Sequence, residues 1–320
     1  MRIERAITSL FSSVVTTEVS VKRYVVHPIF SVSWLPFWLI VAVYSTLVFH
    51  QGLQSALLSI AHEWQMALTM AFGSFVAGGT ALGGGAVAFP VMTKLLHIDP
   101  ATAKVFSLAI QSFGMTAATI TILCRRIPVY GNVVLMALPM AALGVIGSLL
   151  FIAPHAPRLL TKSIFSVLLL CFAITLIYRW WRKAHHLPDH VRIDPKPLRF
   201  MLVAGFGGIA SGLVGSGADI AIFALLVLAY QADVKRATAT SVVIMAFTSI
   251  VGSVLNALYL KTITAEISAY LYAAIPIVVI GAPLGAYVCA KLKVASLVSF
   301  LLVLISLEVG FTSYELYRSF

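Results

Sequence analysis

Charged residues are scarce in this chain. Only 10% of its 320 residues are Asp, Glu, Lys or Arg, whereas 60% are hydrophobic and the mean hydropathy is +1.00. A water-soluble domain carries far more charge, so the composition excludes an ordinary soluble globule. Because one helical span of a bilayer needs about 20 apolar residues, the chain is long enough for many spans joined by short loops.

Cysteine and acidic residues are also few. The three cysteines, Cys124, Cys171 and Cys289, form neither a CxxC pair nor a disulfide pattern. The 22 basic residues outnumber the 11 acidic ones and give a net charge of +11. They lie mostly in short connections between apolar runs, which favours orientation by the positive-inside effect over attraction to nucleic acid. We therefore predict a lipid bilayer, and no nucleic acid, as the partner.

The apolar runs predict an all-α polytopic membrane protein. Seven of them have the length of one ordinary span: residues 29–49, 101–123, 130–152, 159–178, 237–258, 268–290 and 294–311. Two longer stretches, 65–96 and 200–230, contain the glycine clusters Gly83-Gly84-Gly85 and Gly215-Ser216-Gly217, so each is predicted to be a broken helix. Residues 1–24 lack the apolar core of a cleavable signal peptide and are expected to form an interfacial helix.

The two broken stretches begin two halves that resemble each other. Residues 73–85 align with 205–217 without a gap, Ala101-Thr102-Ala103 then matches Ala237-Thr238-Ala239, and Pro139 with Gly144 matches Pro276 with Gly281. An internal repeat is therefore predicted. We expect an N-terminal segment with an extra transmembrane helix (1–64), repeat 1 (65–180), a basic cytoplasmic linker (181–199) and repeat 2 (200–320).

Basic residues indicate how the broken stretches lie in the membrane. If each stretch is a re-entrant hairpin that enters and leaves on one side, 16 of the 22 basic residues fall on the cytoplasmic side, together with the N-terminus. The arm of residues 86–96 supports re-entry, because 11 helical residues are only about 16 Å long. A hairpin plus three spans is an odd number of crossings, so the halves become inverted repeats, as in many secondary transporters.

The glycine clusters are the first candidates for substrate contact. The second arm of a broken helix starts with exposed N–H groups at the positive end of its dipole, which attracts an anion. The candidates in these clusters are Gly83, Gly84, Gly85, Gly215, Ser216 and Gly217. The alternative is close packing of helices, because the glycines also fit small-xxx-small spacing.

Three further polar residues complete the candidate site. Gln111 and Ser241 lie within predicted spans on polar faces, the first shared with Ser107 and Gly114, and they can contact a polar solute or bond neighbouring helices. Asp219 follows the second glycine cluster. A carboxylate there repels an anion unless it is protonated, which suggests proton coupling; the alternative is a cap for the helix that begins there.

The segment Gly-Ser-Phe-Val-Ala-Gly-Gly-Thr-Ala-Leu-Gly-Gly-Gly-Ala-Val-Ala-Phe-Pro at residues 73–90 resembles the glycine-rich signature of the TauE/SafE family of sulfite and organosulfonate permeases. Residues 211–223, followed by 237–243, resemble its second copy, and the likeness extends over about 65–311. Two departures make the pocket asymmetric. Residues 104–107 replace a Thr-Ser pair of the pattern, and Ile222 stands where Pro90 predicts a proline.

The resemblance implies a secondary transporter of small anions, such as sulfite, sulfonates or related sulfur compounds, driven by an ion gradient. It leaves the solute and the direction of transport open. We expect an integral protein of the plasma membrane with a cytoplasmic N-terminus, no cofactor and no metal, and we leave homo-oligomerisation open. The alternatives are an anion channel and a non-transporting scaffold or sensor. An enzyme is not expected, because the chain has no HExxH, no GxSxG and no paired intramembrane aspartates.

Overall fold

The structure is a computed structural model that describes residues 34–80, 83–181 and 196–292, with six single residues between 299 and 310. The chain divides into two compact units, residues 1–34 and 35–320, and all the helices from α2 to α12 belong to the second. The described residues form helices and no strand, so the prediction of an all-α protein is confirmed. The predicted interfacial segment (1–24), most of the linker (181–199) and most of the last predicted span (294–311) lie outside the described residues.

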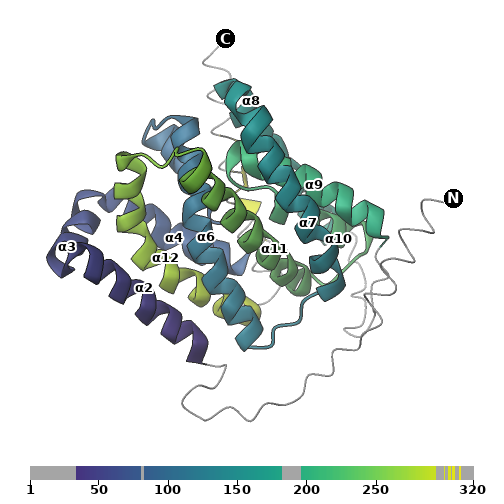
Figure 1. Cartoon of the computed structure of the whole chain (residues 1–320). Helices are drawn as coiled ribbons and strands as arrows, with labels where there is room; N and C mark the ends of the chain where they lie inside the picture. The colour runs from purple at the N-terminus through teal and green to yellow at the C-terminus, as the bar shows by residue number, and fades with distance from the viewer. Residues whose placement is uncertain are drawn as a thin grey trace. The chain divides into compact units, whose positions relative to one another are not determined.

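The helices are joined by short connections, apart from the segment between residues 181 and 197 (Figure 1). They are α2 (Leu35–Gln51), α3 (Leu53–His62), α4 (Trp64–Gly79), α5 (Gly85–Pro90) with the π-helical turn η3 (Val91–Leu95), α6 (Pro100–Cys124), α7 (Gly131–Gly147) with η4 (Ser148–Ile152) and η5 (Ala153–His155), α8 (Arg158–Trp181), α9 (Pro197–Val214), α10 (Ala218–Ala229), α11 (Val234–Val254) with η6 (Leu255–Tyr259), and α12 (Ala265–Lys291).

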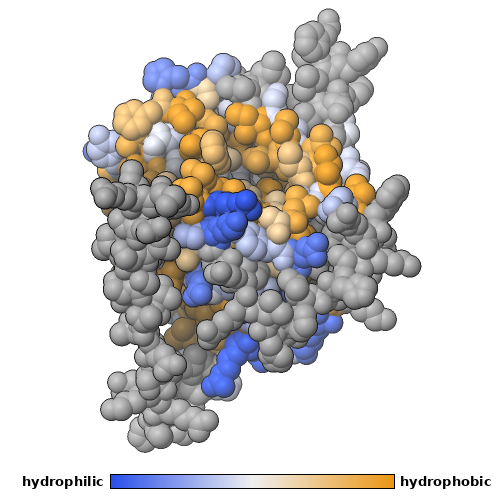
Figure 2. Space-filling view, turned by 90° about the vertical axis from the view of Figure 1, so that its right-hand side faces the viewer, coloured by the Kyte–Doolittle hydropathy of each residue, from blue (hydrophilic) through white to orange (hydrophobic). Residues whose placement is uncertain are grey.

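Five of these helical segments are long and apolar enough to cross a bilayer. They are Pro100–Cys124, Gly131–His155, Pro197–Val214, Val234–Tyr259 and Ala265–Val288. Large apolar side chains such as Leu135, Phe151 and Phe206 are exposed, and hydrophobic residues form a broad patch on the face shown in Figure 2. Lipid tails can cover such side chains, whereas water cannot do so without cost, so the chain is an integral membrane protein.

One helix was missing from the sequence prediction. Residues 50–64 were not assigned to any span, yet α3 lies there and is bent by 97° from α2 at Gly52. Gly52 has a φ of 78°, which a glycine adopts without strain. The described side chains of α3 are not buried, and its Ser and His residues lower its hydropathy, which is why an apolar-run search passes over it.

Helices of each predicted half pack against helices of the other half. In the first half α4 lies along α12 of the second, whereas α9 of the second lies along α7 of the first, and α6 and α11 pack together between these pairs (Figure 1). Small residues allow this close approach. Gly78 faces the backbone of Ala282, and Gly208 faces that of Ala141 so closely that a Cβ at either glycine would overlap it.

Local backbone details also recur in both halves. Asp99 caps α6 and Asp233 caps α11, and each accepts an N–H of its own first turn at 3.0 Å. His97 and Gln231, two residues before these caps, both have a positive φ. The caps pair position 99 with 233 and therefore Ser107 with Ser241. This correspondence differs by two residues from the sequence match of Ala101 with Ala237.

Gly144 provides a test of the packing between α7 and α9. A Cβ at Gly144 would overlap the carbonyl oxygen of Gly205, so Gly144→Ala should lower the free energy of unfolding by about 1–3 kcal/mol. At Gly147, on the same helix, a Cβ would meet nothing within 4 Å. Thermal unfolding in detergent should show a lower midpoint for Gly144→Ala than for Gly147→Ala, and equal midpoints would contradict this packing.

Candidate functional site

The helices are interrupted at both glycine clusters. α4 ends at Gly79 and α5 begins at Gly85, whereas α9 ends at Val214 and α10 begins at Ala218. Gly83 and Gly215 occupy matching positions and have φ values of +66° and +88°. This left-handed conformation is unfavourable for a residue with a side chain, so glycine is required at both turns.

Gln111 lies between the two glycine turns. It is in the middle of α6 and is only 2% exposed. Its Nε2 donates a hydrogen bond of 2.8 Å to the carbonyl oxygen of Gly215. A Cβ built on Gly83 would stand 3.0 Å from its Oε1, and one built on Gly85 would collide with its Nε2. A single side-chain amide therefore contacts both turns.

Asp219 is fully buried in the same place. Its Oδ1 accepts hydrogen bonds from the N–H groups of Gly217 (3.1 Å) and Ile220 (2.9 Å) and from Oγ of Ser216 (3.2 Å). Its Oδ2 points toward the other turn, because a Cβ on Gly83 would stand 2.6 Å from it. The carboxyl group thus caps the positive end of α10 and faces Gly83 at the same time.

The chain itself uses the N–H groups at the start of α10 in this conformation. Ala218 N donates to Oγ of Ser211 at 3.0 Å, while Gly217 N and Ile220 N donate to Asp219. The sequence predicts a bound anion as the acceptor for these donors. Here an anionic side chain of the protein has that position, so an external anion would have to compete with Asp219 for them.

Two buried polar atoms beside the turns have no hydrogen-bond partner among the described residues: Oε1 of Gln111 and Oγ of Ser107. Ser107 is fully buried on α6, and its Cβ would lie 2.7 Å from a Cβ on Gly215. Buried polar groups are nearly always satisfied, and each exception calls for a reason. Each of the two atoms therefore needs a polar partner that the described contacts do not provide.

The other candidates have different surroundings. Gly84 faces Ala77 and Met70 of α4, and Gly217 faces the backbone of α9 at Gly207, which fits the packing alternative. Ser241 is buried, and its Oγ donates to the carbonyl oxygen of Thr238 in its own helix at 2.9 Å. The described contacts therefore join Gly83, Gly85, Gln111, Gly215, Ser216 and Asp219, and they do not extend to Ser241.

Two residues of this centre were not among the predicted site residues. Ser107 precedes Gln111 by four positions, so the helical period alone places both on one face of α6. Ser211 precedes the left-handed Gly215 by four positions, and its hydroxyl is the acceptor for the first N–H of α10. No sequence pattern distinguishes Ser211 from an ordinary small residue in a packed helix.

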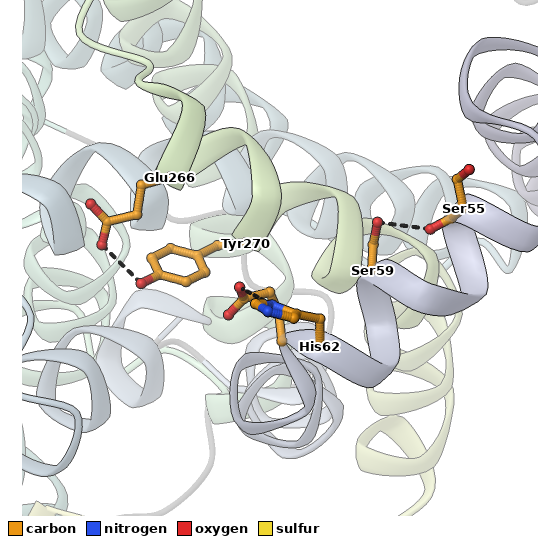
Figure 3. Close-up of polar contacts among 6 residues, drawn as sticks. Ser55, Ser59, His62, Glu266 and Tyr270 are labelled. Carbon is orange, nitrogen blue, oxygen red and sulfur yellow. Dashed lines mark hydrogen bonds and ion pairs between the residues drawn. The ribbon is translucent and has the colours of Figure 1, made fainter.

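A second polar pocket lies on the surface between α3 and α12. Ser55, Ser59, His62 and Glu63 line an open pocket with Leu58 and Ala269. His62 and Glu63 form an ion pair of 2.9 Å, and nearby Tyr270 donates to Glu266 (Figure 3). This pocket contains none of the predicted site residues.

Within residues 34–80, 83–181 and 196–292, no group of three or more His, Cys, Asp or Glu side chains is close enough to hold a metal ion. The histidines of the linker, His185, His186 and His190, lie outside the described residues.

Apolar helices around a buried polar centre built from two helix breaks define a polytopic membrane protein of the transporter class. A family model described as "Sulfite exporter TauE/SafE" matches residues 66–310, which is most of the chain. The chain therefore belongs to the TauE/SafE family, whose members are membrane transporters of sulfur-containing anions. Comparison with curated proteins and with solved structures gives no match.

Ser211→Ala tests how the start of α10 is held. The change leaves the buried N–H of Ala218 without its acceptor, and an unsatisfied buried donor costs about 1–3 kcal/mol. Ser249→Ala is the matched control, because Ser249 is equally buried but only donates to a carbonyl oxygen of its own helix. Thermal unfolding should show a clearly larger decrease for Ser211→Ala; an equal or smaller decrease would contradict this role.

Proposed function

We propose that this protein is an ion-gradient-driven secondary carrier of a small sulfur-containing anion, such as sulfite or an organic sulfonate. The observation that carries the proposal is the buried polar centre at which Gln111 contacts both glycine turns. Family membership supports the class of substrate. The substrate itself and its coupling to an ion gradient are part of the proposal.

We further propose that the halves are inverted repeats with re-entrant hairpins. The second hairpin offers the clearest support, because the start of α9 and the end of α10 lie together. Lys196 N donates to Oη of Tyr230 at 3.2 Å, and the rings of Phe200 and Tyr230 are 5.0 Å apart. A hairpin with both ends on one side matches the re-entrant arrangement. In addition, α4 packs on α12 and α9 packs on α7, so each predicted half contacts the other in the same way, as expected for two related halves.

The orientation follows from basic residues at one end of the bundle. Arg236, at the start of α11, stacks on the ring of Tyr130 at 4.0 Å. Arg125, at the end of α6, and Lys291, at the end of α12, both lie against the ring of Tyr287. By the positive-inside rule we assign this end and the N-terminus to the cytoplasm, and the protein to the plasma membrane.

In this proposal the anion binds where the two turns meet. Gly83 and Gly85 let the backbone approach the amide of Gln111, and Ser107 offers a hydroxyl that no described residue uses. Gly84, Gly215, Ser216 and Gly217 shape the turns, and Ser241 is the matching residue of Ser107 in the second half. The positive end of α10 attracts the anion only when Asp219 is neutral, because two negative charges in a buried site repel each other strongly.

Reconstituted protein tests the carrier directly. Proteoliposomes with a proton gradient should take up or release at least one of sulfite, sulfoacetate and taurine, and the transported anion should raise the thermal unfolding midpoint by mass action. No flux of any anion would refute the carrier. Ion currents far above carrier turnover would instead indicate a channel.

Gly85→Ala tests the position of the site. An added Cβ would collide with the Gln111 amide and stand 3.2 Å from Cβ of Ser216, so flux should fall by about tenfold or more, the equivalent of 1.4 kcal/mol. Gly131→Ala is the control, because a Cβ there would meet nothing within 4 Å. Unchanged flux in folded Gly85→Ala would place the substrate elsewhere, and a scaffold or sensor predicts no effect of either variant on cellular function.

A further inference from the structure

We infer that Asp219 and Gln111 form a hydrogen-bonded pair that binds the coupling proton. When the proton leaves, the hydrogen bond between Gln111 and the second glycine turn breaks, and the turn is released from α6. This inference rests on the proposed carrier function and deepens it. It assigns to Gln111 a part in ion coupling in addition to substrate contact.

Two side-chain oxygen atoms from different helices lie beside Gly83. A Cβ on Gly83 would stand 2.6 Å from Oδ2 of Asp219 and 3.0 Å from Oε1 of Gln111, so both atoms border the same small volume. Asp219 is 0% exposed and Gln111 2% exposed, so bulk water does not screen them. Oε1 has no hydrogen-bond partner among the described residues.

The amide of Gln111 has only one orientation that suits its surroundings. The carbonyl oxygen of Gly215 can only accept, so Nε2 must face it, and the bond there is 2.8 Å. Oε1 then points to the other side, where a Cβ on Gly83 would stand 3.0 Å from it and 2.6 Å from Oδ2 of Asp219. An amide oxygen and an ionised carboxylate are both acceptors. When Asp219 is ionised, two buried acceptor atoms therefore lie close together without a donor between them, which is unfavourable.

A proton on Oδ2 removes this conflict. The two atoms of the carboxyl group already differ. Oδ1 accepts from Gly217 N, Ile220 N and Ser216 Oγ, whereas among the described residues Oδ2 accepts from Ser216 Oγ alone, at 3.3 Å. Oδ1 therefore has the role of the C=O oxygen and Oδ2 that of the O–H donor. The O–H group of Asp219 donates to Oε1 of Gln111, and that acceptor is satisfied.

Loss of the proton changes the preferred orientation of the amide. The carboxylate repels Oε1 of Gln111 and attracts Nε2, so the amide turns over and places Nε2 toward Asp219 and Oε1 toward Gly215. The bond that joins α6 to the turn between α9 and α10 is then broken. The proton comes from the solution on one side and returns to the solution on the other, and no other bond is made or broken. One proton thereby determines whether the second turn is held to α6.

Among the described residues, no charged side chain interacts with the carboxyl group of Asp219. The groups that interact with the Asp219 carboxyl are Ser216 and nearby backbone N–H groups, and none of them is charged. On the helices around α10, the described charged residues are remote: Arg199 begins α9, and Asp233, Lys235 and Arg236 begin α11 at the other end of α10. On α8, the described Cys171 and Tyr178 are exposed. Lys104 of α6 has Asp99 as its electrostatic partner.

Infrared difference spectroscopy of the full-length protein tests the pair without any substrate. The wild type should show the C=O band of a protonated carboxyl group, which disappears as the pH rises. Asp219→Asn, a near-isosteric change, should abolish this band, whereas Asp233→Asn should retain it because Asp233 caps α11 far from the pair. Gln111→Met should keep the band but shift it to higher frequency, because the O–H group has lost its acceptor.

Two spectroscopic results would overturn the inference. One is the absence of a titrating carboxyl band that depends on Asp219 in folded protein. The other is an unshifted band in folded Gln111→Met, which would show that Gln111 does not accept the proton's hydrogen bond.

Transport assays separate this inference from the carrier itself. In proteoliposomes, Asp219→Asn should lose accumulation driven by a pH gradient but keep anion exchange, while Asp233→Asn should retain both. Accumulation driven by a sodium gradient and not by a pH gradient would overturn the proton as the occupant. A carboxyl band with all the expected properties, but no flux of any anion in the wild type, would refute the carrier and leave the protonated pair established.

Discussion

Backbone groups at a helix break inside a membrane have no water to satisfy them, and the rest of this structure depends on how that constraint is met. The second break is satisfied from three sources: Gln111 bonds the carbonyl oxygen of Gly215, Ser211 accepts from Ala218, and Asp219 accepts from Gly217 and Ile220. These groups come from α6, α9 and α10. The same requirement that closes the turn therefore gathers polar and ionisable side chains at the centre of an apolar bundle.

Close packing of small residues is the second requirement. Glycines of α4 and α9 lie directly against backbone atoms of α12 and α7, so each broken helix is supported by a long helix of the other half. Dispersion contacts and close approach must supply this stability, because lipid tails are as apolar as the helix surfaces and the hydrophobic effect does not favour one over the other.

Much of the fold could be predicted from hydropathy and glycine placement. The runs of residues 101–123 and 130–152 correspond to α6 and to α7 with its extensions, because apolar length is a local property. The breaks at the glycine clusters were also predictable, because the low helix propensity of glycine is a local property too. The helix α3 was not predictable, since its polar residues interrupt the apolar signal. The correspondence in position between Ser107 and Ser241 became apparent only from the caps at Asp99 and Asp233.

The site was predictable in its residue types and not in its contacts. Sequence alone determined that Gln111 lies within an apolar span, that Asp219 follows a glycine cluster and that two glycine clusters interrupt apolar stretches. These are local properties, because they depend only on residue type and spacing along the chain. The tertiary structure alone decided that Gly83 and Gly85 face Gln111 whereas Gly84 packs on α4, and that Asp219 takes the position expected for an anion. The reason is physical: residues 111 and 215 meet only when α6 packs on a break in the other half, and hydrogen-bond partners so far apart in the chain leave no local pattern.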